Sequence, residues 1–374
     1  NPTGGIVLLH GLTDCPYSLK DVGEIFYEKG FYVVSMRLPG HGTIPGALKD
    51  VEWEDWLAAV KVACGHVREK VGEGKPFYIA GYSNGGAVAL LYALQGLEDK
   101  NLAAPDRLLL FSPAVGVTRF AALSEWLQVL SFIPYFEKSR WVVITPEYDP
   151  FKYNSFPLNA SEQTYELSMK VKAEIIRNSK NGGLSRLGAI TTFQSVVDST
   201  VIVNDLVRRL YGALDSGEDE LVLFDVNRVS YLHNFFKKDP DELLGYLRKS
   251  GRLGYRLTVV ANKGASSNVV AKTKEKGDGD FSKEVSLGVK WPEEIYSLSH
   301  LAIPIPRDDL LYGFERDSAN NEYPRLGAME LRGERRLLLM TADNLMRLRS
   351  NPFFSYIKKR IGEIVDADLD GTAE

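Results

Sequence analysis

The sequence predicts an α/β protein built on a doubly wound, mostly parallel sheet. Apolar runs without polar alternation, such as residues 4–9 and 107–111, are typical of strands buried on both faces of a parallel sheet. Amphipathic segments with helical spacing separate these runs. Strand and helix therefore alternate repeatedly over the first ~110 residues, which is the pattern of a doubly wound sheet.

The first part of the chain supplies these segments in order. The helix after the first strand carries an apolar face and ends at Gly30, a residue type that commonly stops helices. The helix before the third strand is rich in tryptophan. The expected elements are strand 4–9, helix 19–30, strand 31–36, helix 53–67, strand 77–80, helix 86–95 and strand 107–111.

Residues 81–85, Gly-Tyr-Ser-Asn-Gly, lie between an expected strand and an expected helix. This is the Gly-x-Ser-x-Gly pattern in the strand–turn–helix context that it requires. A Cβ atom at Gly81 or Gly85 would collide with the neighbouring strand or helix, so both positions call for glycine. We therefore predict that Ser83 is a nucleophile whose hydroxyl projects from the sheet.

Three motifs, in this order and spacing, resemble the α/β-hydrolase superfamily. They are Leu-His-Gly-Leu-Thr at 9–13, Arg-Leu-Pro-Gly-His-Gly at 37–42 and Gly-Tyr-Ser-Asn-Gly-Gly at 81–86. The branch they resemble is that of monoacylglycerol lipases, carboxylesterases and serine-aminopeptidase-like hydrolases. The resemblance is specific over residues 4–116 and loose over the rest. Family members normally carry one or two strands before the His-Gly loop, which here are absent or lie upstream of Asn1.

Residues 117–188 break the alternation of strands and helices. An apolar helical stripe at 123–130 and an aromatic loop at 148–157 occur here, at the position where the family inserts a lid over its active site. Most of these aromatic side chains are expected to form the core of the lid, and their surplus favours an apolar substrate channel beneath it. The expected division is core 1–116, lid 117–188 and core 189–374 with an extra insertion around 226–290.

The second part of the core continues the α/β pattern. Between residues 263 and 283 the chain is polar, dotted with glycine and rich in lysine, which predicts a solvated loop. Residues 295–300 return to apolar character. The other expected elements are strand 189–197, helix 205–214, strand 221–225, strand 255–261 and a last amphipathic helix that opens at Pro352.

A nucleophilic serine needs a base to take its proton, and the base needs an acid to fix its tautomer. The family order is serine, acid, histidine. Two histidines follow Ser83 in the chain, His233 and His300. We favour His300 because it follows the last sheet-like segment, in a setting like the family's C-terminal catalytic loop. His233 is the alternative, because the stretch from Asp198 to His300 is longer than the family usually has.

The favoured acid is Asp198. It ends an apolar strand and is followed shortly by valine, which resembles the acid motif of the family. Asp225 ends the next strand and is the rival, although a strand-terminal aspartate also suits a simple turn. The resemblance implies an oxyanion hole made of two backbone N–H groups, those of Leu12 and Asn84.

The remaining histidines and the cysteines are expected to have no part in the chemistry. His10 and His41 resemble structural residues of the oxyanion and neighbouring loops, and His66 is expected to be exposed on a helix. Cys15 and Cys64 make neither a disulfide framework nor metal-ligand spacing, and we expect both to be small buried residues. No metal and no cofactor is implied.

Composition sets outer limits. A chain of 374 residues with 44% hydrophobic and 25% charged residues is long enough for a large core and an accessory domain. The formal charge of −4 argues against a nucleic-acid partner. No apolar run approaches the length of a membrane span. The chain opens with Asn1 directly before its first strand, so it is expected to start inside a longer product, and its localisation and oligomeric state cannot be predicted.

The sequence therefore predicts a serine hydrolase. Its expected substrates are carboxylic esters with an apolar acyl chain, such as monoacylglycerols, lysophospholipids or short-chain esters, and its lid could contact a membrane peripherally. A serine in the turn between strand and helix, at position 83, argues against dehalogenase or epoxide-hydrolase chemistry. These enzymes use a carboxylate as the nucleophile at that position. Two alternatives stay open: a peptide or amide hydrolase on the same triad, and a catalytically silent binding protein with the hydrolase fold.

Overall fold

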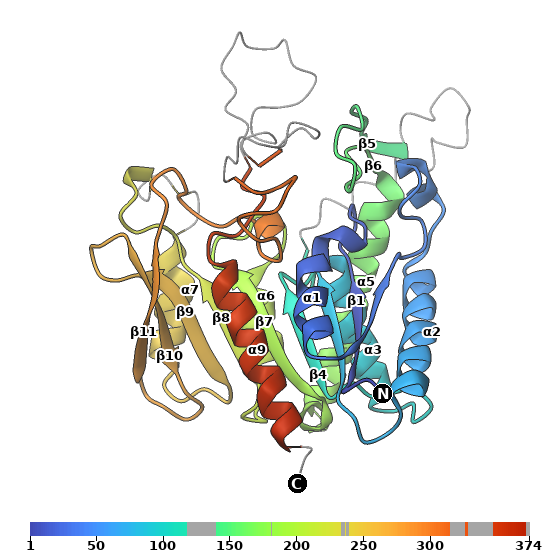
Figure 1. The fold of residues 1–374 in the computed structure, drawn as a ribbon, viewed down its shortest axis with the longest axis horizontal. Coiled ribbons are helices and arrows are strands. Elements are labelled where there is room, and N and C mark those ends of the chain that lie inside the picture. Colours follow the sequence, from blue (N-terminus) through green and yellow to red (C-terminus); the bar gives the residue numbers. More distant parts are fainter. Residues whose placement is uncertain are drawn as a thin grey trace.

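A mostly parallel sheet runs through the centre of the molecule (Figure 1). The computed structural model describes residues 1–117, 140–180, 182–232, 236, 239–314, 326–327 and 347–371. Within these residues the sheet has nine strands in the order β11-β10-β9-β8-β7-β4-β3-β1-β2. Neighbours from β2 to β9 pair in parallel, and β10 and β11 pair antiparallel. The predicted doubly wound α/β fold class is confirmed.

Most central strands are fully buried, because helices cover both faces of the sheet. A separate two-stranded sheet pairs β5 with β6. The strands are β1 (Gly5–Leu9), β2 (Tyr32–Met36), β3 (Phe77–Tyr82), β4 (Arg107–Phe111), β5 (Trp141–Val143), β6 (Phe156–Pro157), β7 (Ala189–Ser195), β8 (Glu220–Phe224), β9 (Arg256–Asn262), β10 (Asn268–Lys274) and β11 (Lys283–Lys290).

Helices α1 (Lys20–Glu28) and α9 (Phe354–Gly371) cover one face of the sheet (Figure 1). The opposite face carries α2 (Trp53–Val71), α3 (Asn84–Gly96), α5 (Leu158–Lys180), α6 (Val203–Asp205) and α7 (Pro240–Lys249). Single helical turns complete the fold: η1 (Pro16–Leu19), η2 (Pro45–Lys49), η5 (Gly183–Arg186), η6 (Leu206–Leu210), η7 (Tyr211–Ala213) and η9 (His300–Ala302).

In a parallel sheet the carboxyl ends of the strands lie at one edge and the amino ends at the other. The carboxyl ends of β1, β3 and β7 share one edge, which brings together the loops that follow them. Ligands of open α/β sheets bind outside this edge. The predicted oxyanion loop, nucleophile and acid all follow these strands, so the topology gathers them at the edge where chemistry is expected.

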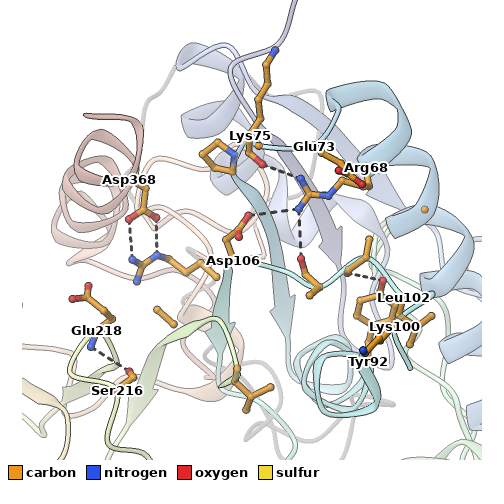
Figure 2. A pocket seen from close by; sticks show the side chains of 18 of the residues that line it. Arg68, Glu73, Lys75, Tyr92, Lys100, Leu102, Asp106, Ser216, Glu218 and Asp368 are labelled. Atoms are coloured by element: carbon orange, nitrogen blue, oxygen red, sulfur yellow. Dashed lines mark hydrogen bonds and ion pairs between the residues drawn. The ribbon is translucent and has the colours of Figure 1, made fainter. Parts of the chain in front are cut away.

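A cavity of about 1070 Å³ lies at the opposite edge, where β3 and β4 begin (Figure 2). Arg68 donates to the carbonyl of Lys75 at 2.9 Å and lies 3.6 Å from the carboxylate of Asp106. Arg107 pairs with Asp368 of α9 at 3.0 Å. These arginines therefore join helices to the amino ends of the strands, and the cavity is remote from the edge that carries the predicted site.

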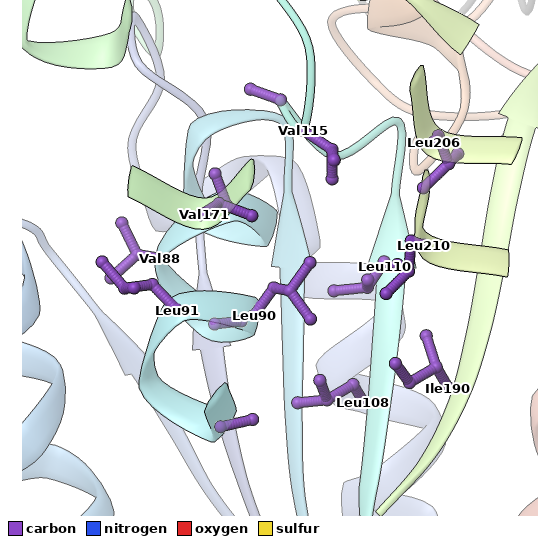
Figure 3. Close-up of a cluster of buried hydrophobic side chains, with 14 of the residues drawn as sticks. Val88, Leu90, Leu91, Leu108, Leu110, Val115, Val171, Ile190, Leu206 and Leu210 are labelled. Carbon is purple, nitrogen blue, oxygen red and sulfur yellow. The ribbon is translucent and has the colours of Figure 1, made fainter. Parts of the chain in front are cut away.

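The larger hydrophobic core lies between the sheet and the α3 side (Figure 3). Leu90 of α3 lies toward Leu108 and Leu110 of β4, whereas Val88 and Leu91 lie on the side of Val171 of α5. All six side chains are fully buried. Truncating one such leucine to alanine typically costs about 2–5 kcal/mol. The apolar stripe of α5 is therefore part of the main core, against α3.

The expectation for residues 263–283 is wrong. The predicted solvated loop at 263–283 contains β10, which pairs with β9 and buries Val269 and Val270. Its lysines suggested a loop, but the strand is mostly buried and pairs with the charged, largely exposed edge strand β11. The predicted helix at 205–214 is confirmed as a continuous helical segment over 203–213, with a π-helical turn in its middle and a 3-10 turn at its end, and Leu206 and Leu210 are buried as its pattern implied.

The expected division into core 1–116, lid 117–188 and core 189–374 with an insertion around 226–290 stays a prediction. The apolar stripe at 123–130 lies outside the described residues.

Candidate active site

The turn between β3 and α3 holds Ser83 in a strained conformation. Its φ of 54° and ψ of −116° lie in a region that non-glycine residues rarely adopt. The surrounding backbone fixes this geometry: the Ser83 amide donates to Phe111 O at 2.9 Å, and the Ser83 carbonyl accepts from Ala114 N at 3.0 Å. The serine therefore stands at the carboxyl edge of the sheet on a rigid, over-determined turn.

The two glycines of the motif are required by close backbone approach. A Cβ at Gly81 would lie 2.5 Å from the carbonyl oxygen of Gly85. A Cβ at Gly85 would lie 2.2 Å from the carbonyl oxygen of Leu9 in β1. Real Cβ atoms do not approach backbone this closely, so the sharp turn exists only because both side chains are absent.

Asp198 and His300 form a buried hydrogen bond. Nδ1 of His300 lies 2.8 Å from Oδ2 of Asp198, and each residue is only 4% exposed. The other Asp198 oxygen accepts from the amides of Thr200 at 2.7 Å and Val201 at 3.0 Å, and Gln194 Nε2 donates to Oδ2 at 2.8 Å. The carboxylate is thus held from several sides.

The charge state of Asp198 follows from these contacts. Burial by itself would raise the pKa of the carboxyl group. The charge of His300, its hydrogen bond and the two backbone amides outweigh burial and hold the pKa of Asp198 below its usual value of 3.8. An ionised Asp198 accepts from Nδ1–H, which leaves Nε2 of His300 with the lone pair that a general base needs.

His300 lies on an irregular segment that joins the sheet edge at a few points. Ser297 bridges to Val226 after β8, and Ser195 Oγ donates to the carbonyl of Leu298 at 3.0 Å. The His300 ring lies 5.3 Å from the ring of Tyr82, the residue before Ser83. The fold therefore brings His300 to the serine turn. The apolar run at 295–300 is not a strand of the sheet, contrary to its sheet-like sequence.

The predicted oxyanion residue Leu12 lies in a loop whose backbone is bound by two histidines. His41 Nε2 lies 2.7 Å from the carbonyl of Leu12. His10 accepts from Leu38 N at 3.0 Å through Nε2, so its Nδ1–H donates to Gly11 O at 2.8 Å. Burial and the neighbouring His41 lower the pKa of His10 to about 3, so the ring is neutral. Both histidines are structural here, as expected.

Asn84 supplies the second predicted oxyanion amide. It is the first residue of α3, and amides in the first turn of a helix have no intrahelical acceptor. The positive end of the helix dipole also lies here, which favours negative charge. The Asn84 amide thus has the surroundings that an oxyanion donor requires.

The rival residues are placed differently. The carboxylate of Asp225 is bound by Arg228, whose Nε and Nη2 donate at 2.8 and 2.7 Å. Asp225 is therefore a partner of a guanidinium within its own loop. His233, the alternative base, lies outside the described residues.

Sequence reasoning missed the residues that contact the predicted oxyanion loop from the aromatic loop. Tyr153 N donates to Thr13 O at 2.7 Å, and Lys152 forms a buried ion pair with Asp14. The Tyr153 hydroxyl also accepts from Thr43 N at 2.9 Å. The aromatic loop at 148–157 was noticed for its composition. Its pairing with residues about 140 positions earlier has no local sequence signal.

The described residues contain no group of three or more His, Cys, Asp or Glu side chains arranged to hold a metal ion. Nor does any helix in these ranges have the length and apolarity needed to cross a membrane. Both cysteines are free, and Cys15 is only partly buried, where the sequence predicted full burial.

The sequence has relatives among characterised families. Residues 1–155 match the family model described as "Serine aminopeptidase, S33". The chain is 30% identical over 89 residues to a thermostable monoacylglycerol lipase of Bacillus sp. (strain H-257), covering 24% of this chain and 34% of that protein. It is 34% identical over 98 residues to a putative 2-succinyl-6-hydroxy-2,4-cyclohexadiene-1-carboxylate synthase of Haemophilus influenzae, covering 26% and 37%. The chain thus spans about a third of the length of these curated relatives.

Solved structures also resemble the chain. A structure of the metagenome-derived lipolytic enzymes LipS and LipT aligns at 20% identity with a TM-score of 0.47, covering 66% of this chain and 94% of that one. A soluble variant of monoglyceride lipase from Saccharomyces cerevisiae aligns at 14% identity with a TM-score of 0.43, covering 60% and 78%. Residues 1–155 are therefore similar to the family described as serine aminopeptidase, S33, and the chain has the mostly parallel α/β sheet described above.

Proposed function

We propose that this protein is a serine hydrolase that cleaves carboxylic esters with an apolar acyl chain. Ser83 is the nucleophile, His300 the general base and Asp198 the residue that orients it. The observation that carries the proposal is the buried 2.8 Å hydrogen bond between Asp198 and His300 beside the strained serine turn. A buried carboxylate on one imidazole nitrogen prepares the other nitrogen to take a proton from a hydroxyl.

The reaction is acyl transfer in two stages. The Ser83 hydroxyl oxygen attacks the ester carbonyl while its proton moves to Nε2 of His300, and Asp198 stabilises the imidazolium. The amides of Leu12 and Asn84 donate to the oxyanion. His300 then protonates the leaving alcohol. A water molecule, activated by the same histidine, releases the acid and regenerates the serine. These steps need neither a metal nor a cofactor.

The proposed substrate class rests on sequence similarity to a lipase and on the aromatic loop at 148–157. A relative that is 30% identical over 89 residues is a monoacylglycerol lipase by name. We infer a small, lipid-like ester as the substrate. Residues 117–188 would act as a lid, and this lid would be the part that contacts a membrane peripherally. A peptide or amide substrate is the second candidate, because the matched family model is described as serine aminopeptidase.

Hydrolysis of p-nitrophenyl butyrate and octanoate tests the proposal, with aminoacyl anilides as the amide comparison. We expect the wild type to cleave the esters and to be labelled by a fluorophosphonate probe. Ser83→Ala should abolish both, and His300→Ala should abolish turnover. His233→Ala should remain active. If His233→Ala lost activity and His300→Ala retained it, the general base would be His233. An inert, unlabelled wild type would favour the silent binding protein.

A further inference from the structure

A cavity of about 230 Å³ is lined in part by the sequence neighbours of two residues of the proposed catalytic centre. One wall includes Thr13, the neighbour of the oxyanion residue Leu12. Another includes Leu301, the neighbour of His300. A substrate whose carbonyl is held between Leu12 and His300 can therefore extend into this cavity with its acyl or its alcohol part.

The lining of the cavity carries an excess of positive charge. Its charged side chains are Asp149, Lys152, Arg347 and Arg349. Arg349 lies 3.3 Å from the carboxylate of Asp149, and Lys152 is paired with Asp14. Within each pair the positive and the negative charge cancel. The remaining charge on the wall is the guanidinium of Arg347.

The guanidinium of Arg347 has N–H donors that can bind a ligand. Its Nη2 donates to the hydroxyl of Thr200 at 3.1 Å, and within the described ranges it forms no ion pair with a carboxylate. A guanidinium has five N–H donors, so most of its donors have no partner among the residues that the structure describes. The Thr200 amide in turn donates to Asp198 at 2.7 Å, so Arg347 lies beside the loop that carries the proposed acid.

We propose that this cavity is a subsite for an anionic group and that Arg347 binds a carboxylate or phosphate carried by the ester substrate. The proposal rests on the proposed esterase function and narrows its substrate class from neutral esters to anionic ones. Arginine suits this role because its planar fork binds both oxygens of such a group. The partly buried setting strengthens the interaction relative to open water.

A purely structural role for Arg347 makes a different prediction. Through Thr200, whose amide binds Asp198, Arg347 could merely steady the acid loop. Its loss would then slow neutral and anionic esters by the same factor. The ratio of the two rates, and not either rate alone, separates the roles.

The first experiment compares kcat/KM for mono-p-nitrophenyl adipate and p-nitrophenyl hexanoate, two six-carbon acyl esters that differ in a terminal carboxylate. A second pair, 1-octanoylglycerol 3-phosphate and 1-octanoylglycerol, places the anion in the alcohol part. We expect the wild type to prefer the anionic member of one pair, and that pair identifies the source of the anion. Arg347→Gln should lower this preference about tenfold, equivalent to ~1.4 kcal/mol. Arg347→Lys should keep part of it.

Matched controls keep the result interpretable. Arg252→Gln removes an exposed guanidinium that is distant from Arg347 in the sequence, and it should leave the preference for the anionic ester unchanged. The wild-type preference should fall as sodium chloride rises, because salt screens the attraction. Calorimetric binding of hexylphosphonate, weaker in Arg347→Gln, tests the subsite without turnover. Equal rates within both pairs, or a ratio that Arg347→Gln leaves unchanged, would overturn the subsite. Failure of the neutral esters and of fluorophosphonate labelling would instead overturn the esterase function.

Discussion

Asp198 and His300 are 102 positions apart in the chain, yet a 2.8 Å hydrogen bond joins Oδ2 of one to Nδ1 of the other. The parallel sheet makes this possible, because the loops after β7 and β8 and the segment around His300 meet at one edge. The bond is buried and its carboxylate is held by two further amides. Its chemical consequence is a fixed imidazole tautomer.

Replacing Asp198 by asparagine should therefore lower kcat by about 10⁴-fold with little change in KM, because the amide no longer fixes the productive tautomer. Asp225→Asn is the matched control, since Asp225 binds Arg228 and not a histidine. Ester hydrolysis per unit of folded protein measures both variants. Equal losses in the two variants would contradict the assignment of Asp198.

Acid should destabilise the fold through His10 before it affects the carboxylates. The folded pKa of His10 is about 3, against 6.5 for a free imidazole, so between these values the unfolded chain binds a proton that the folded chain does not. The free energy of unfolding then falls with decreasing pH, by up to about 1.4 kcal/mol per pH unit. The contribution of Asp198, whose folded pKa is lowered, is lost only below pH 3.8.

Urea unfolding between pH 7 and 4.5 measures this slope. His10→Gln should flatten the profile, and His66→Gln, which changes an exposed ring bonded to Tyr32, should not. Burial also lowers the pKa of His41, so His41 adds to the slope in the same direction. A wild-type profile that is level over this range would refute the assignment of a neutral, buried His10.

The ion pair between Lys152 and Asp14 should stabilise the fold only as a pair. Both side chains are nearly buried, at 11% and 3% exposure. Lys152→Met leaves a buried, unpaired carboxylate and should cost about 3–5 kcal/mol of unfolding free energy. The double variant Asp14→Asn with Lys152→Met should recover a substantial part of this loss. Denaturant unfolding of the single and double variants gives the coupling energy, and additive losses would show that the two groups act independently.

The parts of the site that were predictable are those with a local cause. The Gly81-to-Gly85 turn was recognised because its glycines, serine and flanking apolar run are contiguous in sequence. Asp198 was proposed as the acid because it ends an apolar strand and is followed shortly by valine. Resemblance supplied what spacing alone could not, namely which distant histidine should accompany it.

The parts that were missed depend on pairing between distant segments. Lys152 pairs with Asp14, and Tyr153 donates to Thr13, in the predicted oxyanion loop. Nothing in the sequence of the aromatic loop specifies these partners. Strand β10 was missed for a related reason. Its burial comes from pairing with β9, which outweighs the lysines that suggested a loop.

The elbow glycines give the sharpest test of local geometry. Gly85→Ala would place a Cβ 2.2 Å from Leu9 O, and because the obstacle is backbone in the central sheet it cannot move aside. We expect this variant to unfold at a markedly lower temperature and to lose fluorophosphonate labelling at Ser83. Gly96, near the end of the same helix, has open space around its Cβ position. Gly96→Ala should therefore stabilise the protein by about 0.4–1 kcal/mol. Thermal unfolding of the two variants would contradict this account if both changed stability in the same direction, because only the first position is closed by backbone.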